Sequence, residues 1–247
     1  MIIATSGASI IMTNQSFPFA PLALLRLQSW LSPTFPVGSY SYSHGLEWAV
    51  EAGHVHDRKS LVDWLEADLR YGSGWNEAIF FSEAWRRAVE ANQAKLLEVA
   101  ELAAAFRGTA EFALESSQQG AACLMTLSRV WSDPLLVWLW ETLCEGQVQP
   151  AMAVVLGVRS AKQDLPLSLS LPAFLQSYVA NWVTAGVRLI PLGQTDGQLA
   201  IAALEEAVLL AGEQAEKATI EDLGSAGFMV DLASMAHETQ YTRLFRS

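Results

Sequence analysis

Two short segments that contain histidine are the first places in this sequence where residue type and spacing suggest chemistry. His237-Glu238 matches the start of the zinc-protease motif His-Glu-X-X-His, in which a second histidine one helical turn later completes the metal site. Tyr241 occupies that position, so a zinc protease is not predicted. His54 and His56 could hold a metal as a His-X-His pair, but the chain has four histidines and no acidic or thiol cluster near these two. We interpret them as solvated loop residues, with metal binding by this pair as the alternative.

The segment 38–45 (Gly-Ser-Tyr-Ser-Tyr-Ser-His-Gly) places hydroxyl groups close in sequence to the imidazole of His44. Serine hydrolases of the α/β class hold their nucleophile in a Gly-X-Ser-X-Gly turn between a strand and a helix, and this segment lacks that turn. We interpret it as a backbone turn with a helix cap. The alternative is a helical enzyme whose apolar pocket is centred on His44 and Glu47.

The remaining polar patterns do not define a catalytic set. Gly193 and Gly197 are not followed by Gly-Lys-Ser/Thr, so the chain has no P-loop and any nucleotide chemistry must come from a partner. One predicted helix carries the polar residues Glu111, Glu115, Gln118 and Gln119. These residues form either a buried polar network or a solvated helix face, and the sequence leaves both open. We predict no catalytic residue, no resident metal and no cofactor.

Composition and charge narrow the classes of partner. The chain has 247 residues with 26 acidic and 15 basic side chains, and its formal net charge of -11 repels nucleic acid. The densest apolar run, 135–143, is about half of what spans a bilayer, so no membrane insertion is expected. Cys123 and Cys144 lie among apolar residues and are predicted to be reduced core thiols in a cytoplasmic protein. Nine tryptophans and only 17% charged residues suggest apolar protein interfaces.

Helical spacing of apolar residues dominates, which predicts an all-α fold. We expect one domain, 21–235, as a bundle of about ten helices, after a disordered extension, 1–20, that has no signal-peptide pattern. Asp57 and Asp133 are predicted N-caps, and Ser170 is expected to cap a central helix that ends before Pro191. The predicted helices are 22–31, 44–51, 59–71, 75–90, 94–107, 109–130, 134–145, one starting near 150, 170–190, 198–217 and 230–236. A turn is expected at 192–197.

The last residues, 236–247, mix charged and apolar side chains and are predicted to be a docking tail. A chain terminus is usually disordered unless something ties it down. The apolar side chains of Tyr241, Leu244 and Phe245 therefore need a groove, either in this protein or in a partner.

Three segments together resemble the urease accessory protein UreF family. The first is 32–47, Ser-Pro-Thr-Phe-Pro-Val-Gly-Ser-Tyr-Ser-Tyr-Ser-His-Gly-Leu-Glu, similar to the family's Ser-Pro…Leu-Pro-Val-Gly…Tyr-Ser…Gly-Leu-Glu pattern. The second runs from Tyr178 to Gln198 and includes Arg-Leu-Ile-Pro-Leu-Gly-Gln-Thr-Asp-Gly-Gln, and the third is the ending His-Glu-Thr-Gln-Tyr-Thr-Arg-Leu-Phe, 237–245. Ser39 and Tyr40 replace the family's frequent Gly and Phe, which affects only the loop conformation.

The resemblance implies a helical, homodimeric scaffold for urease maturation that catalyses nothing itself. It would bridge UreD (also called UreH) and the GTPase UreG, and the resulting complex would deliver nickel to apo-urease. Nickel would then be bound by the complex and GTP by UreG. The partner-binding residues that it implies are His237, Glu238, Gln240, Tyr241, Arg243, Leu244 and Phe245 in the tail, Pro191, Gly193, Gln194 and Gln198 in the turn, and Tyr42. The alternatives are the helical enzyme described above and a stand-alone nickel-binding protein using His54 and His56.

Overall fold

The computed structural model describes residues 20–246, and within this range the chain is a single all-α domain without strands. Residues 1–19 of the expected N-terminal extension lie outside the described part. The helices are α1 Pro21–Trp30, α2 Leu46–Glu51, α3 Arg58–Tyr71, α4 Ser73–Val89, α5 Gln93–Ala105, α6 Ala110–Val130, α7 Pro134–Glu145, α8 Met152–Ala161, α9 Leu167–Leu189, α10 Gln194–Ala215 and α11 Phe228–His237. Two short 3-10 helices, Ser39–Ser41 and Ile220–Asp222, complete the described structure.

Helix starts follow the capping chemistry of the sequence. The Asp57 carboxylate accepts a hydrogen bond from the Ser60 backbone N–H at 2.7 Å, and Asp133 accepts one from Leu135 at 2.9 Å. Both predicted N-caps are therefore confirmed, and each satisfies a backbone donor that the first helical turn leaves free.

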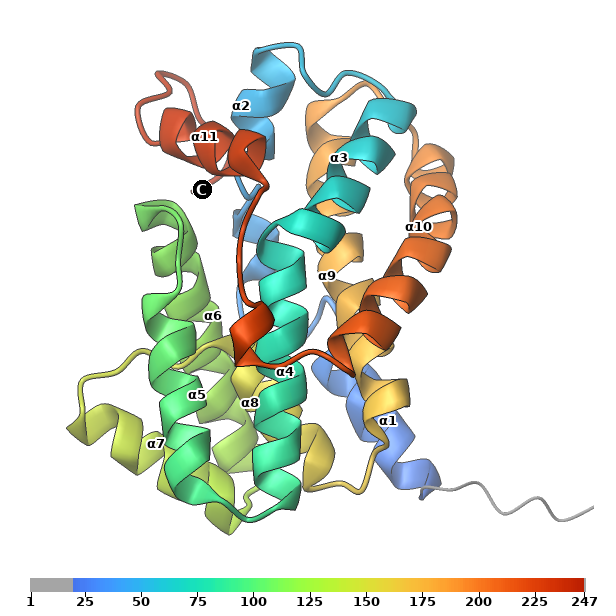
Figure 1. The fold of residues 1–247 in the computed structure, drawn as a ribbon. Coiled ribbons are helices and arrows are strands. Elements are labelled where there is room, and N and C mark those ends of the chain that lie inside the picture. Colours follow the sequence, from blue (N-terminus) through green and yellow to red (C-terminus); the bar gives the residue numbers. More distant parts are fainter. Residues whose placement is uncertain (1–19, 247) are drawn as a thin grey trace, which may run out of the picture.

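The core lies where long helices cross around α8. Every residue from Ala153 to Ala161 is buried, and α8 packs closely against α4 because Gly157 lets the two backbones approach. In Figure 1, α5, α6 and α7 lie on one side of α4, whereas α3, α9 and α10 lie on the other. Helices α2 and α11 pack together at one end of the molecule (Figure 1). No helix in residues 20–246 is long and apolar enough to span a membrane.

Three expectations differ from the structure. The central helix α9 starts at Leu167, so Ser170 lies inside it and donates its hydroxyl hydrogen to the Pro166 carbonyl at 3.0 Å instead of capping. Helix α10 starts at Gln194 and absorbs most of the expected turn, because Asp196 accepts a hydrogen bond from the Gly193 backbone N–H and caps the helix. Cys123 is buried as expected, but Cys144 is exposed, because it lies on the solvent-facing side of α7.

Candidate functional site

His237 forms the centre of a buried ionic cluster at the end of α11. Its side chain is fully buried between two carboxylates that other helices supply. The Nδ1 atom lies 2.9 Å from Glu111 Oε2 on α6, and the Nε2 atom lies 3.2 Å from Glu47 Oε2 on α2. Both ring nitrogens thus face carboxylate oxygens, and each contact requires a shared proton. Burial raises the pKa of Glu111, while His237 and Arg243 act to lower it.

The same Glu47 carboxylate holds the C-terminal tail against the body of the protein. The backbone N–H of Leu244 donates to Glu47 Oε1 at 2.6 Å, and that of Phe245 donates to Oε2 at 2.9 Å. The Arg246 backbone N–H donates to the Ser41 carbonyl at 2.8 Å. Hydrogen bonds to an ionised acceptor are stronger than neutral ones, so Glu47 is the main polar anchor of the tail.

Phe245 adds an apolar anchor. Its ring is 4% exposed, and the Arg188 guanidinium carbon lies 4.3 Å above the ring centroid. Arg188 also donates to the Tyr40 carbonyl at 2.9 Å, which fixes the guanidinium between α9 and the 38–45 segment. A cation over an aromatic face stabilises by about 0.5–2 kcal/mol. The groove that Phe245 needs therefore lies in this protein.

The other apolar side chains near the C-terminus face outward. Tyr241 is fully exposed and Leu244 is 59% exposed, although the tail backbone is fixed. The outer face of α11 adds four more exposed apolar side chains, Phe228, Met229, Leu232 and Met235. We call these six residues the C-terminal apolar face. Several large exposed apolar side chains on one helix and the tail that follows it are typical of a protein-binding site.

The remaining predicted partner-binding residues fall into exposed and buried groups. Pro191, Gly193, Gln194 and Gln198 are exposed at the start of α10, which lies toward the same end of the molecule as α11 in Figure 1. Gly193 has a φ of −81° and is the N-cap of α10. Glu238 and Arg243 are exposed, and Gln240 is partly exposed and contacts Glu51. Tyr42 is buried and donates to Gln118 Oε1 at 2.5 Å, and the same oxygen accepts from Arg246 of the tail at 3.4 Å.

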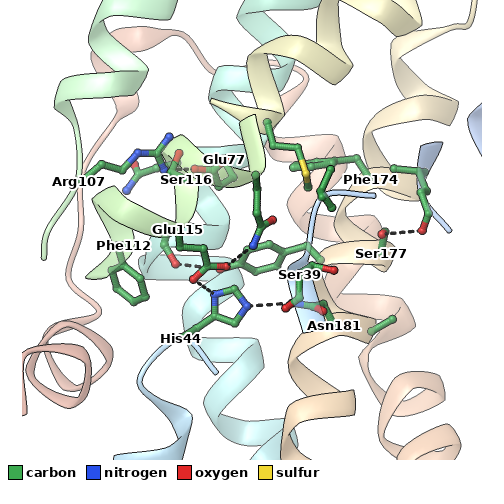
Figure 2. Close-up of a pocket in the computed structure, with 18 of the residues that line it drawn as sticks. Ser39, His44, Glu77, Arg107, Phe112, Glu115, Ser116, Phe174, Ser177 and Asn181 are labelled. Atoms are coloured by element: carbon green, nitrogen blue, oxygen red, sulfur yellow. Dashed lines mark hydrogen bonds and ion pairs between the residues drawn. The ribbon is translucent and has the colours of Figure 1, made fainter. Parts of the chain in front are cut away.

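A separate cleft of about 490 Å³ opens beside His44, and Figure 2 shows its lining. His44 Nδ1 lies 3.0 Å from Glu115 Oε2, its Nε2 lies 3.1 Å from Asn181 Nδ2, and its ring stacks on Trp182 at 4.4 Å between centroids. Gln119 donates from Nε2 to Glu115 Oε1 at 2.7 Å. The polar residues of α6 therefore form a largely buried network, not a solvated face.

His44 and Glu47, considered above as the centre of an enzymatic pocket, do not face the same cavity in the structure. His44 lines the cleft, but Glu47 points to His237 and the tail. His54 and His56 are exposed, and His56 Nε2 lies 3.9 Å from Asp57 Oδ2. Among residues 20–246, no three His, Cys, Asp or Glu side chains are grouped so that they could hold a metal ion.

Comparison with known proteins identifies the family. A family model described as UreF matches residues 55–205. The chain is 48% identical over 243 residues to "Urease accessory protein UreF" of Rhodopseudomonas palustris strain BisB5, covering 98% of this chain and 97% of that protein. The chain belongs to the urease accessory protein UreF family. The protein of the same name from Bradyrhizobium diazoefficiens is 47% identical over 225 residues, covering 91% of this chain and 92% of the relative.

Membership of the UreF family confirms the resemblance found in the three sequence segments. The structure brings all three segments together. Glu47 of the first segment accepts from Leu244 of the third, and Arg188 of the second contacts both Phe245 and the Tyr40 carbonyl. Sequence reasoning missed Glu47, Glu111 and Arg188 as the groups that hold the tail. The sequence indicated a role for these residues only through their position. Glu47 is the last residue of the first segment, and Arg188 is the first residue of the Arg-Leu-Ile-Pro run in the second.

Proposed function

We propose that this protein is a non-catalytic, cytoplasmic scaffold that bridges UreD (UreH) and the GTPase UreG during insertion of nickel into apo-urease. Family membership supports a role as a urease accessory protein. In this proposal nickel is the cargo of the complex and GTP is bound by UreG. The sequence supports the assignment of GTP binding to UreG, because this chain has no P-loop.

The C-terminal apolar face carries the proposal. Glu47 fixes the tail backbone at Leu244, and α11 packs against α2. The side chains of the face project into solvent, and those on α11 are from 46% exposed for Met229 to 69% for Phe228. A fixed backbone reduces the conformational entropy lost on binding, so an exposed apolar face on a fixed tail is suited to tight association. We assign UreD to this face.

Charged groups at the rim of the face would orient the partner. The Arg243 guanidinium lies 3.2 Å from Glu111 Oε1 but remains 40% exposed, so it can also donate to a carboxylate of UreD. Glu238 is also exposed. Tyr241 and Leu244 then fill apolar positions in UreD, while Phe245 stays in its own groove.

A second surface is proposed for further assembly with UreG. Pro191, Gly193, Gln194 and Gln198 are exposed at the start of α10, and Arg58 of α3 lies 3.3 Å from Asp196 in the same helical turn. The first turn of α10 is therefore a rigid, exposed element and not a mobile loop.

The test is co-expression of this chain with UreD and UreG from the same genome, followed by measurement of the mass of the purified assembly. We expect the complete chain to co-purify with UreD, and deletion of residues 240–247 to abolish co-purification while the helical circular dichroism remains. Leu232→Ser should weaken binding to UreD by about tenfold, because a central apolar contact contributes at least about 1.4 kcal/mol.

Leu209→Ser on α10 is the matched control, since Leu209 and Leu232 are 58% and 53% exposed. This variant should bind UreD normally. An undiminished complex after deletion of residues 240–247 would overturn the assignment of UreD to the C-terminal apolar face.

A further inference from the structure

Arg159 is a buried cation that lacks an acidic partner. The residue is 3% exposed on α8, where every residue from Ala153 to Ala161 is buried. Within residues 20–246 its guanidinium forms no salt bridge, and residues 1–19 contain no Asp or Glu that could supply one. An arginine side chain keeps its proton in proteins, so this charge is permanent. A buried ion without a partner is unfavourable, which makes Arg159 a candidate for binding an anion.

The contacts that Arg159 does make leave its N–H groups without an acceptor. Its guanidinium carbon lies 5.1 Å from the ring centroid of Trp30 on α1, and an aromatic face attracts a cation. Arg159 also lies in the last turn of α8, where the helix dipole favours a positive charge. Neither interaction accepts a hydrogen bond. The Nε atom is fully covered without a partner, whereas the two Nη atoms are not fully covered and reach the surface.

A second guanidinium lies beside the first. Arg26 of α1 donates from Nη1 to Gln163 Oε1 at 2.5 Å. Arg26 precedes Trp30 by four residues in α1, and Gln163 follows Arg159 by four residues just past the end of α8. The two contacts between these helices are therefore about one helical turn apart. Burial lowers the pKa of Arg159, and the positive charge of Arg26 lowers it further.

The nearby acidic group does not cancel both cations. The Asp133 carboxylate attracts Arg159 without forming a salt bridge with it, because it caps α7 by accepting from the Leu135 backbone N–H at 2.9 Å. Two guanidinium groups and one carboxylate leave one positive charge in excess, in a chain whose formal net charge is -11. A singly charged anion matches this excess. A carboxylate also has the geometry to accept two parallel hydrogen bonds from one guanidinium.

We propose that Arg159 and Arg26 bind one carboxylate between α1 and the end of α8. Arg159 would donate to it through its Nη atoms, and Arg26 would attract it while remaining bonded to Gln163. The carboxylate can belong to a free organic acid or to an Asp or Glu side chain of another protein chain. This site is independent of the proposed scaffold role.

The test uses the isolated chain and two probes of similar size, propionate and the neutral propionamide, at an ionic strength held constant with sodium chloride. The Nε–H signal of Arg159 in a heteronuclear NMR spectrum reports on the site directly. We expect propionate to shift this signal saturably and to bind at least tenfold more tightly than propionamide. Propionate should also raise the urea unfolding midpoint, because a ligand of the folded state stabilises that state.

Arg159→Met should abolish the stabilisation by propionate, because methionine fills apolar space without a charge. Arg70→Met is the matched control. Arg70 is exposed on α3 and pairs with Glu66 of the same helix, so this variant should keep the full response to propionate. Equal stabilisation of the parent and of Arg159→Met would overturn the proposal.

Asp133→Asn provides a response that loss of folding cannot imitate. Asparagine caps a helix about as well as aspartate, so the start of α7 is preserved. Removal of the negative charge should tighten binding of propionate several-fold. Unchanged affinity of this variant, or equal affinity of the parent for propionate and propionamide, would contradict a carboxylate site at Arg159.

Calorimetric titration of the purified UreD complex identifies the source of the carboxylate. Loss of propionate binding in the complex assigns the site to an acidic side chain of the partner, and unchanged binding assigns it to a free organic acid. Because the first titrations need no partner, their failure would leave the proposed scaffold role untouched.

Discussion

Asp68 shows how a charged residue can belong to an apolar helix face. It is fully buried on α3 and accepts hydrogen bonds from the Ser73 N–H at 3.0 Å, the Gly74 N–H at 3.0 Å and the Tyr178 hydroxyl at 2.8 Å. The carboxylate thereby satisfies backbone donors in the first turn of α4. Burial raises the pKa of Asp68, and the hydrogen bonds oppose this only in part.

This raised pKa predicts a measurable pH dependence of stability. The folded protein keeps the Asp68 proton to higher pH than the unfolded chain, whose carboxyl titrates near 3.8. The contribution of Asp68 to the unfolding free energy is therefore complete below pH 3.8 and is lost as the pH rises through the folded pKa, with a slope of at most about 1.4 kcal/mol per pH unit.

Asp68→Asn should lack this slope and should also destabilise the protein by about 1–3 kcal/mol, because an amide nitrogen would face the Ser73 or Gly74 donor. Urea unfolding of both proteins between pH 4 and pH 7 measures the difference. Parallel pH profiles would show that the Asp68 carboxyl titrates alike in the folded and unfolded states.

At the scale of elements, the sequence predicts helices well where side chains cap them. Asp57, Thr109 and Asp133 each accept a backbone hydrogen bond at the predicted start of a helix. The predicted starts of the two helices α9 and α10, Ser170 and Gln198, are three and four residues later than the observed starts. In α9 the expected cap, Ser170, lies inside the helix and donates to the Pro166 carbonyl. In α10 the side chain of Asp196, which lies in the first turn, accepts from the backbone N–H of the N-cap Gly193.

Helix packing gives a second kind of prediction, at the contact between α4 and α8. A Cβ atom on Gly157 would lie 2.4 Å from the Phe81 carbonyl oxygen, which belongs to the α4 backbone and has little freedom to move. Gly157→Ala gains about 1 kcal/mol of helix propensity but should lose about 3 kcal/mol to the clash, so the net effect is destabilising.

The measurement is urea unfolding, with Gly224→Ala as the control. A Cβ atom on Gly224 meets no atom within 4 Å, and this substitution should change stability by less than about 0.5 kcal/mol. A Gly157→Ala protein as stable as the parent would mean that α4 and α8 can separate slightly without loss of core packing.

At the scale of the whole molecule, the contacts that build the candidate site join distant parts of the chain. Glu47 and His237 are separated by 190 positions, and Glu111 and His237 by 126. The sequence indicated that the tail docks and that its apolar residues need a groove, but local patterns carry no information on which helix supplies the groove. The anchors of Phe245 and the division between His44 and Glu47 therefore required the structure.

The exposed apolar surface also leads to a prediction about self-association. Leu22 and Leu25 on α1 are 54% and 60% exposed, and they are separate from the C-terminal apolar face. We expect a homodimer, with a mass twice the 26.9 kDa of the chain in light scattering at micromolar concentration. The protein without residues 240–247 is the control and should remain dimeric. A mass of one chain at every concentration would contradict the expectation.

The hydrogen bonds from Leu244 and Phe245 to Glu47 have a consequence for synthesis of the protein. Glu47 leaves the ribosome 197 residues before Leu244, the first of its two donors. Domains form while translation proceeds from the N-terminus, so the helical body can fold before its tail exists. A chain released before residue 241 would then be folded yet would lack Tyr241 and Leu244 of the C-terminal apolar face. A partner that needs all six residues of the face would therefore select molecules that have been translated past the tail.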